Sequence, residues 1–167
     1  MTNSKAASKP KSKKLTVAAL NKLDAELNEI KTVPILGGQY QCSIDRTFRH
    51  SKIQELLFAY FALLEEAQQD GGIARKTLHR VPALLHALIV KYFTDLPLQS
   101  AETLENLTAV SHKLLDLGIM DQLFSGTENG FDPSQIEKVS KAIRKSSESL
   151  GGMLEETDKI SVIAKGV

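Results

Sequence analysis

The segment V-P-A-L-L-H-A-L-I-V-K-Y-F, residues 81–93, decides the fold because nearly every position in it is apolar. Only His86 and Lys91 interrupt the run of alanine, leucine, isoleucine and valine. A helix that is apolar on almost every side is buried in a core or covered by a partner. Pro82 suits a first helical turn, so the pattern predicts a central helix from about Arg80 to Phe93.

The segment before this helix predicts a second, amphipathic helix that ends at Gly71-Gly72. Ser51, with Gln54 three residues later, resembles a capping box at its start. Phe58 falls off the apolar face. That face is expected to comprise Ile53, Leu56, Leu57, Tyr60, Phe61 and Leu64.

The segment after residue 97 predicts three further helical pieces. Ser100 is expected to cap a helix that closes at Gly118, and residues 119–124 add a turn or two. Residues 126–132 read as a loop. A last amphipathic helix is expected over 133–157, with Asp132 as its cap and Gln135 completing a capping box, before a flexible tail over 158–167.

The N-terminal part is more varied. Residues 1–14 carry five lysines and no acidic residue, which predicts a disordered basic arm. A short helix with Ala19, Leu23, Leu27 and Ile30 on one face should follow. Alternating residues near 32–45, on either side of Gly37-Gly38, predict a β-hairpin with a two-residue turn and with Cys42 facing inward. The fold class is therefore mainly α: a compact helical core domain over 15–125, with five or six helices in the whole chain and a small N-terminal β-hairpin.

Composition restricts the function. Lys and Arg number 21 against 20 Asp and Glu, so no overall charge draws the chain to nucleic acid or to a membrane surface. The single cysteine excludes an intramolecular disulfide. Without a run of about 18–20 apolar residues, a membrane span is not expected. We expect a cytoplasmic protein.

Catalytic and metal-binding patterns are missing from the sequence. The four histidines show no HExxH spacing, and Glu65 and Glu66 are adjacent, so they diverge around a helix. Nucleophile-elbow and phosphate-binding glycine motifs do not occur. We therefore expect no enzyme, no cofactor and no metal. What remains is apolar helical surface, which either closes the core or binds another protein.

The order of these segments resembles the tail assembly chaperones of long-tailed bacteriophages and prophages of Gram-positive bacteria. The likeness covers about residues 15–157. It rests on L-T-V-A-A-L (15–20), S-I-D-R-T-F-R-H-S-K (43–52), L-I-V-K-Y-F-T-D (88–95) and L-L-D-L-G-I-M-D-Q-L (114–123). The longer basic arm and the G-T-E-N-G loop depart from that pattern.

The resemblance implies a non-enzymatic factor of the host cytoplasm that coats the tape measure protein and helps to recruit tail tube subunits. Self-association is left open, whereas membrane and nucleic acid are not expected partners. The client surface is expected on the helix of residues 80–96 and on the terminal helix. Its residues would be Leu84, Leu88, Tyr92, Ile136, Val139, Ile143 and Leu150.

Two other hypotheses compete with that of a tail assembly chaperone. A small nucleic-acid-associated or regulatory protein-binding module would use the basic N-terminal arm, and its nucleic-acid binding would fall steeply with salt. An orphan enzyme would need a polar pocket with perturbed acids or histidines, and nothing in the sequence indicates its place.

Overall fold

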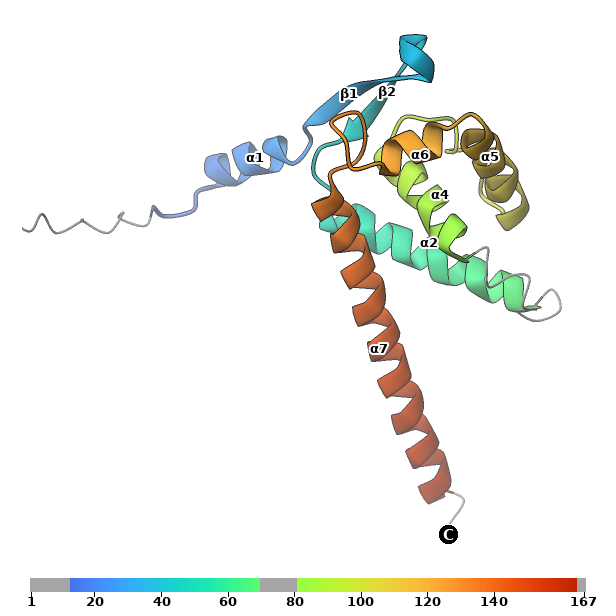
Figure 1. Cartoon of the computed structure of the whole chain (residues 1–167). Helices are drawn as coiled ribbons and strands as arrows, with labels where there is room; N and C mark the ends of the chain where they lie inside the picture. Colours follow the sequence, from blue (N-terminus) through green and yellow to red (C-terminus); the bar gives the residue numbers. More distant parts are fainter. Residues whose placement is uncertain (1–12, 70–80, 165–167) are drawn as a thin grey trace, which may run out of the picture.

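The computed structural model describes residues 13–69 and 81–164, so the predicted basic arm and the Gly71-Gly72 stop fall largely or wholly outside it. The described chain is mainly α with one small antiparallel hairpin, as predicted (Figure 1). Its elements are α1 (Val17–Glu26), β1 (Ile30–Ile35), a 3-10 turn (Leu36–Gly38), β2 (Tyr40–Asp45), α2 (His50–Gln69), α4 (Val81–Phe93), α5 (Leu104–Asp116), α6 (Ile119–Phe124) and α7 (Pro133–Ala164).

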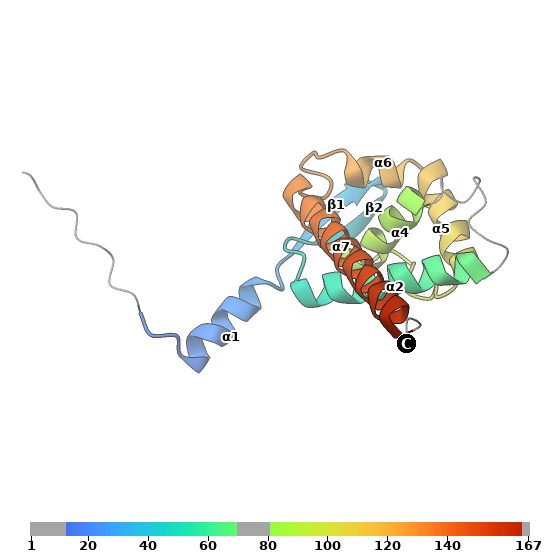
Figure 2. The same cartoon turned by 90° about the horizontal axis from the view of Figure 1, so that it is seen from below.

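Helix α4 is central, which confirms the prediction from its composition. It packs against both α2 and α5, and the hairpin lies over its C-terminal end (Figures 1 and 2). Its buried side chains, together with those of the neighbouring elements, form one continuous core. The core side chains of α4 are Leu84, Ala87, Leu88, Ile89, Val90 and Phe93.

An aromatic cluster joins α4 to the segments that precede α2 and α7. The ring of Phe48, just before α2, stacks on Phe93 with centroids 3.7 Å apart. Phe131, just before α7, meets Phe48 edge-on at 5.6 Å and Phe124 of α6 at 5.2 Å. Burial of three phenylalanines at one junction fixes the start of α2 and the start of α7 against α4.

The hairpin has the predicted inward face but a different turn. Val33 pairs with Cys42, and both are buried, whereas Pro34 is exposed on the other face. The last pair is Ile35 with Tyr40, so the connection contains four residues instead of the predicted two. Leu36, Gly37 and Gly38 all have positive φ, which the glycines tolerate and which lets the 3-10 turn close the longer loop.

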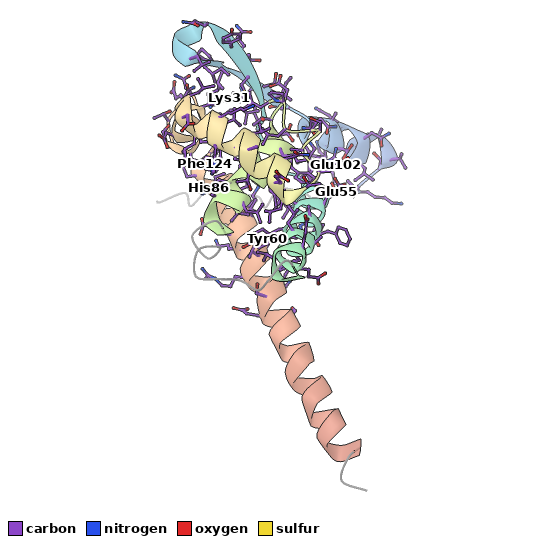
Figure 3. The ribbon with its side chains drawn as sticks, turned by 90° about the vertical axis from the view of Figure 1, so that its right-hand side faces the viewer. Lys31, Glu55, Tyr60, His86, Glu102 and Phe124 are labelled. Carbon is purple, nitrogen blue, oxygen red and sulfur yellow. The ribbon has the colours of Figure 1, made fainter. Side chains whose placement is uncertain are left out.

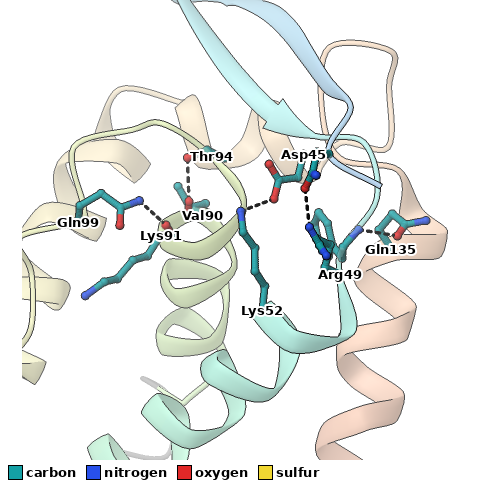
Figure 4. Close-up of polar contacts among 10 residues, drawn as sticks. Asp45, Arg49, Lys52, Val90, Lys91, Thr94, Gln99 and Gln135 are labelled. Atoms are coloured by element: carbon teal, nitrogen blue, oxygen red, sulfur yellow. Dashed lines mark hydrogen bonds and ion pairs between the residues drawn. The ribbon is translucent and has the colours of Figure 1, made fainter. Parts of the chain in front are cut away.

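Strand β2 is tied to the end of α4 on its other side. The Asp95 amide donates to the Ser43 carbonyl at 3.2 Å, and the Ser43 amide donates to Asp95 Oδ1 at 2.8 Å. Thr94 donates its hydroxyl to the Val90 carbonyl at 2.7 Å (Figure 4), which satisfies a buried polar group. The segment after α4 therefore protects part of the second strand edge.

Two predicted helix caps are wrong because the helices begin elsewhere. Helix α2 begins at His50, so Ser51 lies inside its first turn. Helix α5 begins at Leu104, and Thr103 is its cap, accepting a hydrogen bond from the Asn106 amide at 3.3 Å, whereas Ser100 lies outside the helix. Gly118 has a φ of 71°, which confirms the predicted glycine at the end of α5.

Helix α7 begins at Pro133, as predicted, but its cap works differently. Asp132 Oδ1 accepts from the Ser134 amide at 2.8 Å. Gln135 does not return to Asp132 in a capping box; instead its Oε1 accepts from the Phe48 amide at 3.0 Å (Figure 4). The helix continues to Ala164, beyond the predicted end at 157, because no proline interrupts it and two glycines cost only about 1 kcal/mol each.

The loop before α7 leaves no room for a side chain at Gly130. A β-carbon there would lie 2.6 Å from the Leu123 carbonyl oxygen and 2.7 Å from that of Gln122. Both are backbone atoms of α6, so Gly130→Ala should lower the free energy of unfolding by about 1–3 kcal/mol. Urea unfolding followed by circular dichroism measures this change, with the exposed neighbour Asn129→Ala as control. Equal stability of the two variants would contradict the expectation.

Candidate functional surface

The polar side chains of the described residues do not form a candidate metal site. No group of three or more His, Cys, Asp or Glu that could hold a metal ion occurs among them. His86 lies on α4, and its ring packs on that of Phe124 of α6, with the ring centroids 4.3 Å apart (Figure 3). Desolvation lowers the pKa of His86, which favours the neutral ring and a packing role.

The predicted contact residues of α4 serve the core instead. Leu84 and Leu88 are buried, and Tyr92 is partly buried against the core. Desolvation, with the nearby negative charge of Glu55, raises the pKa of Tyr92. Buried side chains offer no contact area to a partner while the fold is intact. Of the three predicted residues of α4, only Tyr92 therefore has appreciable surface left for a partner.

The predicted contact residues of α7 are divided. Val139 is fully buried. Ile136 and Ile143, on the same side of the helix, are partly buried and pack against the core. This part of α7 lies on α2. The side chain of Leu150 is outside the described residues. Beyond its contact with α2, α7 runs away from the rest of the molecule (Figure 1).

The most apolar exposed surface of the described chain lies on α1, which has no buried residue. Leu20, Leu23 and Leu27 are exposed by 52%, 51% and 42%. Their spacing of three and four residues places them along one side of the helix, and we call them the α1 stripe. Figures 1 and 2 show α1 standing apart from the helical body.

Helix α1 is well formed although it has no buried residue. The Thr16 hydroxyl caps it by accepting from the Ala19 amide at 3.2 Å. Arg49, the residue before α2, contacts the other end of α1: its guanidinium donates to Asn28 Oδ1 at 2.6 Å and to Asp24 Oδ1 at 2.5 Å. Asp24 and Asn28 lie beside the stripe, so these contacts link α1 to the segment before α2 and leave the leucines uncovered.

Sequence reasoning missed this surface because it assigned α1 to the core domain. The same three- and four-residue spacing that marks Leu23 and Leu27 is found in buried helices. One signal was available: a single apolar row among polar residues covers less area than the faces of α2 or α4. It did not tell whether that row was covered.

The family of the chain follows from a comparison along nearly its whole length. A family model described as YomO matches residues 17–166. The chain belongs to the YomO family. This family is associated with prophages of Bacillus. The match begins at the first residue of α1 and runs past the end of α7, so both projecting helices belong to the YomO unit.

Other comparisons do not extend this assignment. No curated protein and no solved structure gave a significant match to the YomO chain. Within the described part of the chain, none of the helices is long and apolar enough to cross a membrane.

Proposed function

We propose that this YomO protein is a non-enzymatic tail assembly chaperone that binds the tape measure protein of its phage and helps to recruit tail tube subunits. Membership of a prophage-associated family supports the proposal. So does the order of the sequence segments, which resembles that of tail assembly chaperones. The observation that carries it is the α1 stripe, an apolar helical face that the molecule's own core leaves uncovered.

The size of the stripe suits a chaperone that must be displaced later. Burying the exposed half of each leucine contributes about 1 kcal/mol. Three leucines therefore contribute about 3 kcal/mol, which is less than the 4–15 kcal/mol that association typically costs. One such contact binds weakly. Many copies on a long helical client, or a second contact from α7, would raise the total, and each copy could still leave singly.

We place the main client contact on α1 instead of α4. Leu84 and Leu88 of α4 are buried in the core, whereas Leu20, Leu23 and Leu27 are exposed and can pack against a helical partner. Helix α7 remains a candidate second client contact because it extends beyond the body (Figure 1).

Co-expression with the tape measure protein of the same prophage tests the proposal. The wild-type chain should raise the soluble fraction of the client and co-purify with it. Leu20→Asp combined with Leu23→Asp should abolish both effects, because a charge in the stripe cannot be buried against an apolar face.

The matched control is Leu115→Asp on α5, since that leucine is exposed by 52%, as Leu20 is. It should leave client binding unchanged, and circular dichroism should show that all variants fold. A client that stays insoluble with the wild-type chain would overturn the function. Binding that survives Leu20→Asp and Leu23→Asp would overturn the assignment to α1.

A further inference from the structure

We propose that, in the absence of a client, the α1 stripes of two copies pack against each other in an antiparallel, two-fold symmetric dimer. The dimer stands on the geometry and charge of α1, whereas its role in covering the client surface rests on the proposed function. An apolar helical face exposed to water lowers its free energy by finding a cover, and a second copy is always present.

The spacing of the stripe fits helix pairing. Thr16, Leu20, Leu23 and Leu27 follow one another at intervals of four, three and four residues, which is the spacing of a coiled-coil seam. In an antiparallel pair whose two-fold axis passes between Leu20 and Leu23, Leu20 lies beside Leu23 of the partner subunit. The same contact repeats by symmetry. Thr16 then lies near Leu27 of the partner subunit and closes each end of the seam.

The charges of the segment are complementary to themselves in this orientation. Lys13 and Lys14 precede α1, whereas Glu26 ends it and Glu29 follows. All four residues are exposed. An antiparallel pair brings the basic end of each copy to the acidic end of the other, whereas a parallel pair would place like charges together. Charge therefore selects the antiparallel dimer.

The arrangement of the molecule leaves room for the second copy. Helix α1 points away from the body, with its N-terminal end farthest out (Figures 1 and 2). Antiparallel pairing places the body of the partner subunit beyond that end. Arg49 holds α1 in this outward position through Asp24 and Asn28, so the stripe is not turned onto its own body.

The dimer should be reversible. A helix of ten residues is about 15 Å long, and two such helices bury much less than the roughly 1,600 Å² of a standard stable interface. Weak pairing would let a client compete for the same leucines.

Sedimentation velocity of the full chain, from about 1 µM to about 1 mM, tests the dimer. The wild type should pass from monomer to dimer with concentration, and more weakly at high salt. Lys13→Glu with Lys14→Glu should weaken dimerisation at least about tenfold, and so should Glu26→Lys with Glu29→Lys. Mixing these two variants should restore the dimer as a heterodimer, as should all four changes in one chain.

Lys113→Glu with Lys145→Glu provides the matched control. It changes net charge as Lys13→Glu with Lys14→Glu does, but on the exposed faces of α5 and α7, and should leave the dimer unchanged. A chain that stays monomeric to about 1 mM would overturn the proposal. So would a dimer that persists in Leu23→Asp, or charge-reversed variants that fail to pair when mixed.

Adding the tape measure protein separates this inference from the proposed function. If the wild-type dimer forms and the client dissociates it, both stand. If the client binds and the dimer persists, the function stands and the covering role is wrong. If the dimer forms and no client binds, the function is wrong and the dimer stands.

Discussion

Phe93→Ala should lower the free energy of unfolding by about 3–5 kcal/mol, the cost of deleting a buried phenylalanine ring. Phe93 is fully buried at the end of α4 and stacks on Phe48. Its loss leaves a cavity where the start of α2, the end of α4 and the start of α7 meet. A domain of this size has a total stability of only about 5–15 kcal/mol, so the variant should be partly unfolded at modest urea concentration.

Phe58→Ala is the matched control for this prediction. It also removes a phenylalanine ring, this one on α2, but Phe58 is exposed by 79%. The free energy of unfolding should therefore change by no more than about 0.5 kcal/mol. Urea unfolding of both variants, followed by circular dichroism, gives the comparison. Similar losses in the two variants would mean that the aromatic junction does not carry the core.

The thiol of Cys42 should react with a disulfide reagent at least about 1000 times more slowly in the native protein than in the urea-unfolded chain. Burial, and then the negative charge of Asp95, raises the pKa of Cys42 from 9.0 to about 12. At pH 8 the thiolate fraction is about one in ten in the unfolded chain and about one in ten thousand in the native protein. The native side chain also has no exposed surface.

The same shift sets the direction of a pH effect on stability. The native state holds the Cys42 proton more tightly than the unfolded chain, so this contribution is complete below pH 9 and is lost as the pH rises towards 12. Cys42→Ala should flatten the fall in stability over that range. Rapid native labelling at pH 8 would show that the thiol is accessible. If Cys42→Ala left the fall in stability unchanged, the pKa of Cys42 would not be raised in the native protein.

Most of the secondary structure could be predicted from local pattern. The all-round apolar composition of 81–93 indicated a central helix, and Phe58 was correctly placed off the apolar face of its helix. The alternation through Val33 and Cys42 indicated the buried face of the hairpin. These features depend on residues within a few positions of one another, so sequence spacing is sufficient evidence for them.

The errors arose where two local choices were nearly equal. Ser100 and Thr103 are both good caps, and the start of α5 selects Thr103. Gln135 suits a capping box, but the Phe48 amide, 87 residues away in the chain, takes its side-chain oxygen instead. Local propensity cannot rank such alternatives, because the deciding partner comes from a distant segment.

The sequence by itself determined which faces of this chain are apolar, and with them the helical fold class and the hairpin. Only the tertiary structure decided which of those faces are covered. It buried Leu88 of α4 and Val139 of α7, and it left Leu20, Leu23 and Leu27 of α1 exposed. The physical reason is that periodicity describes one segment, whereas burial depends on what other segments bring against it.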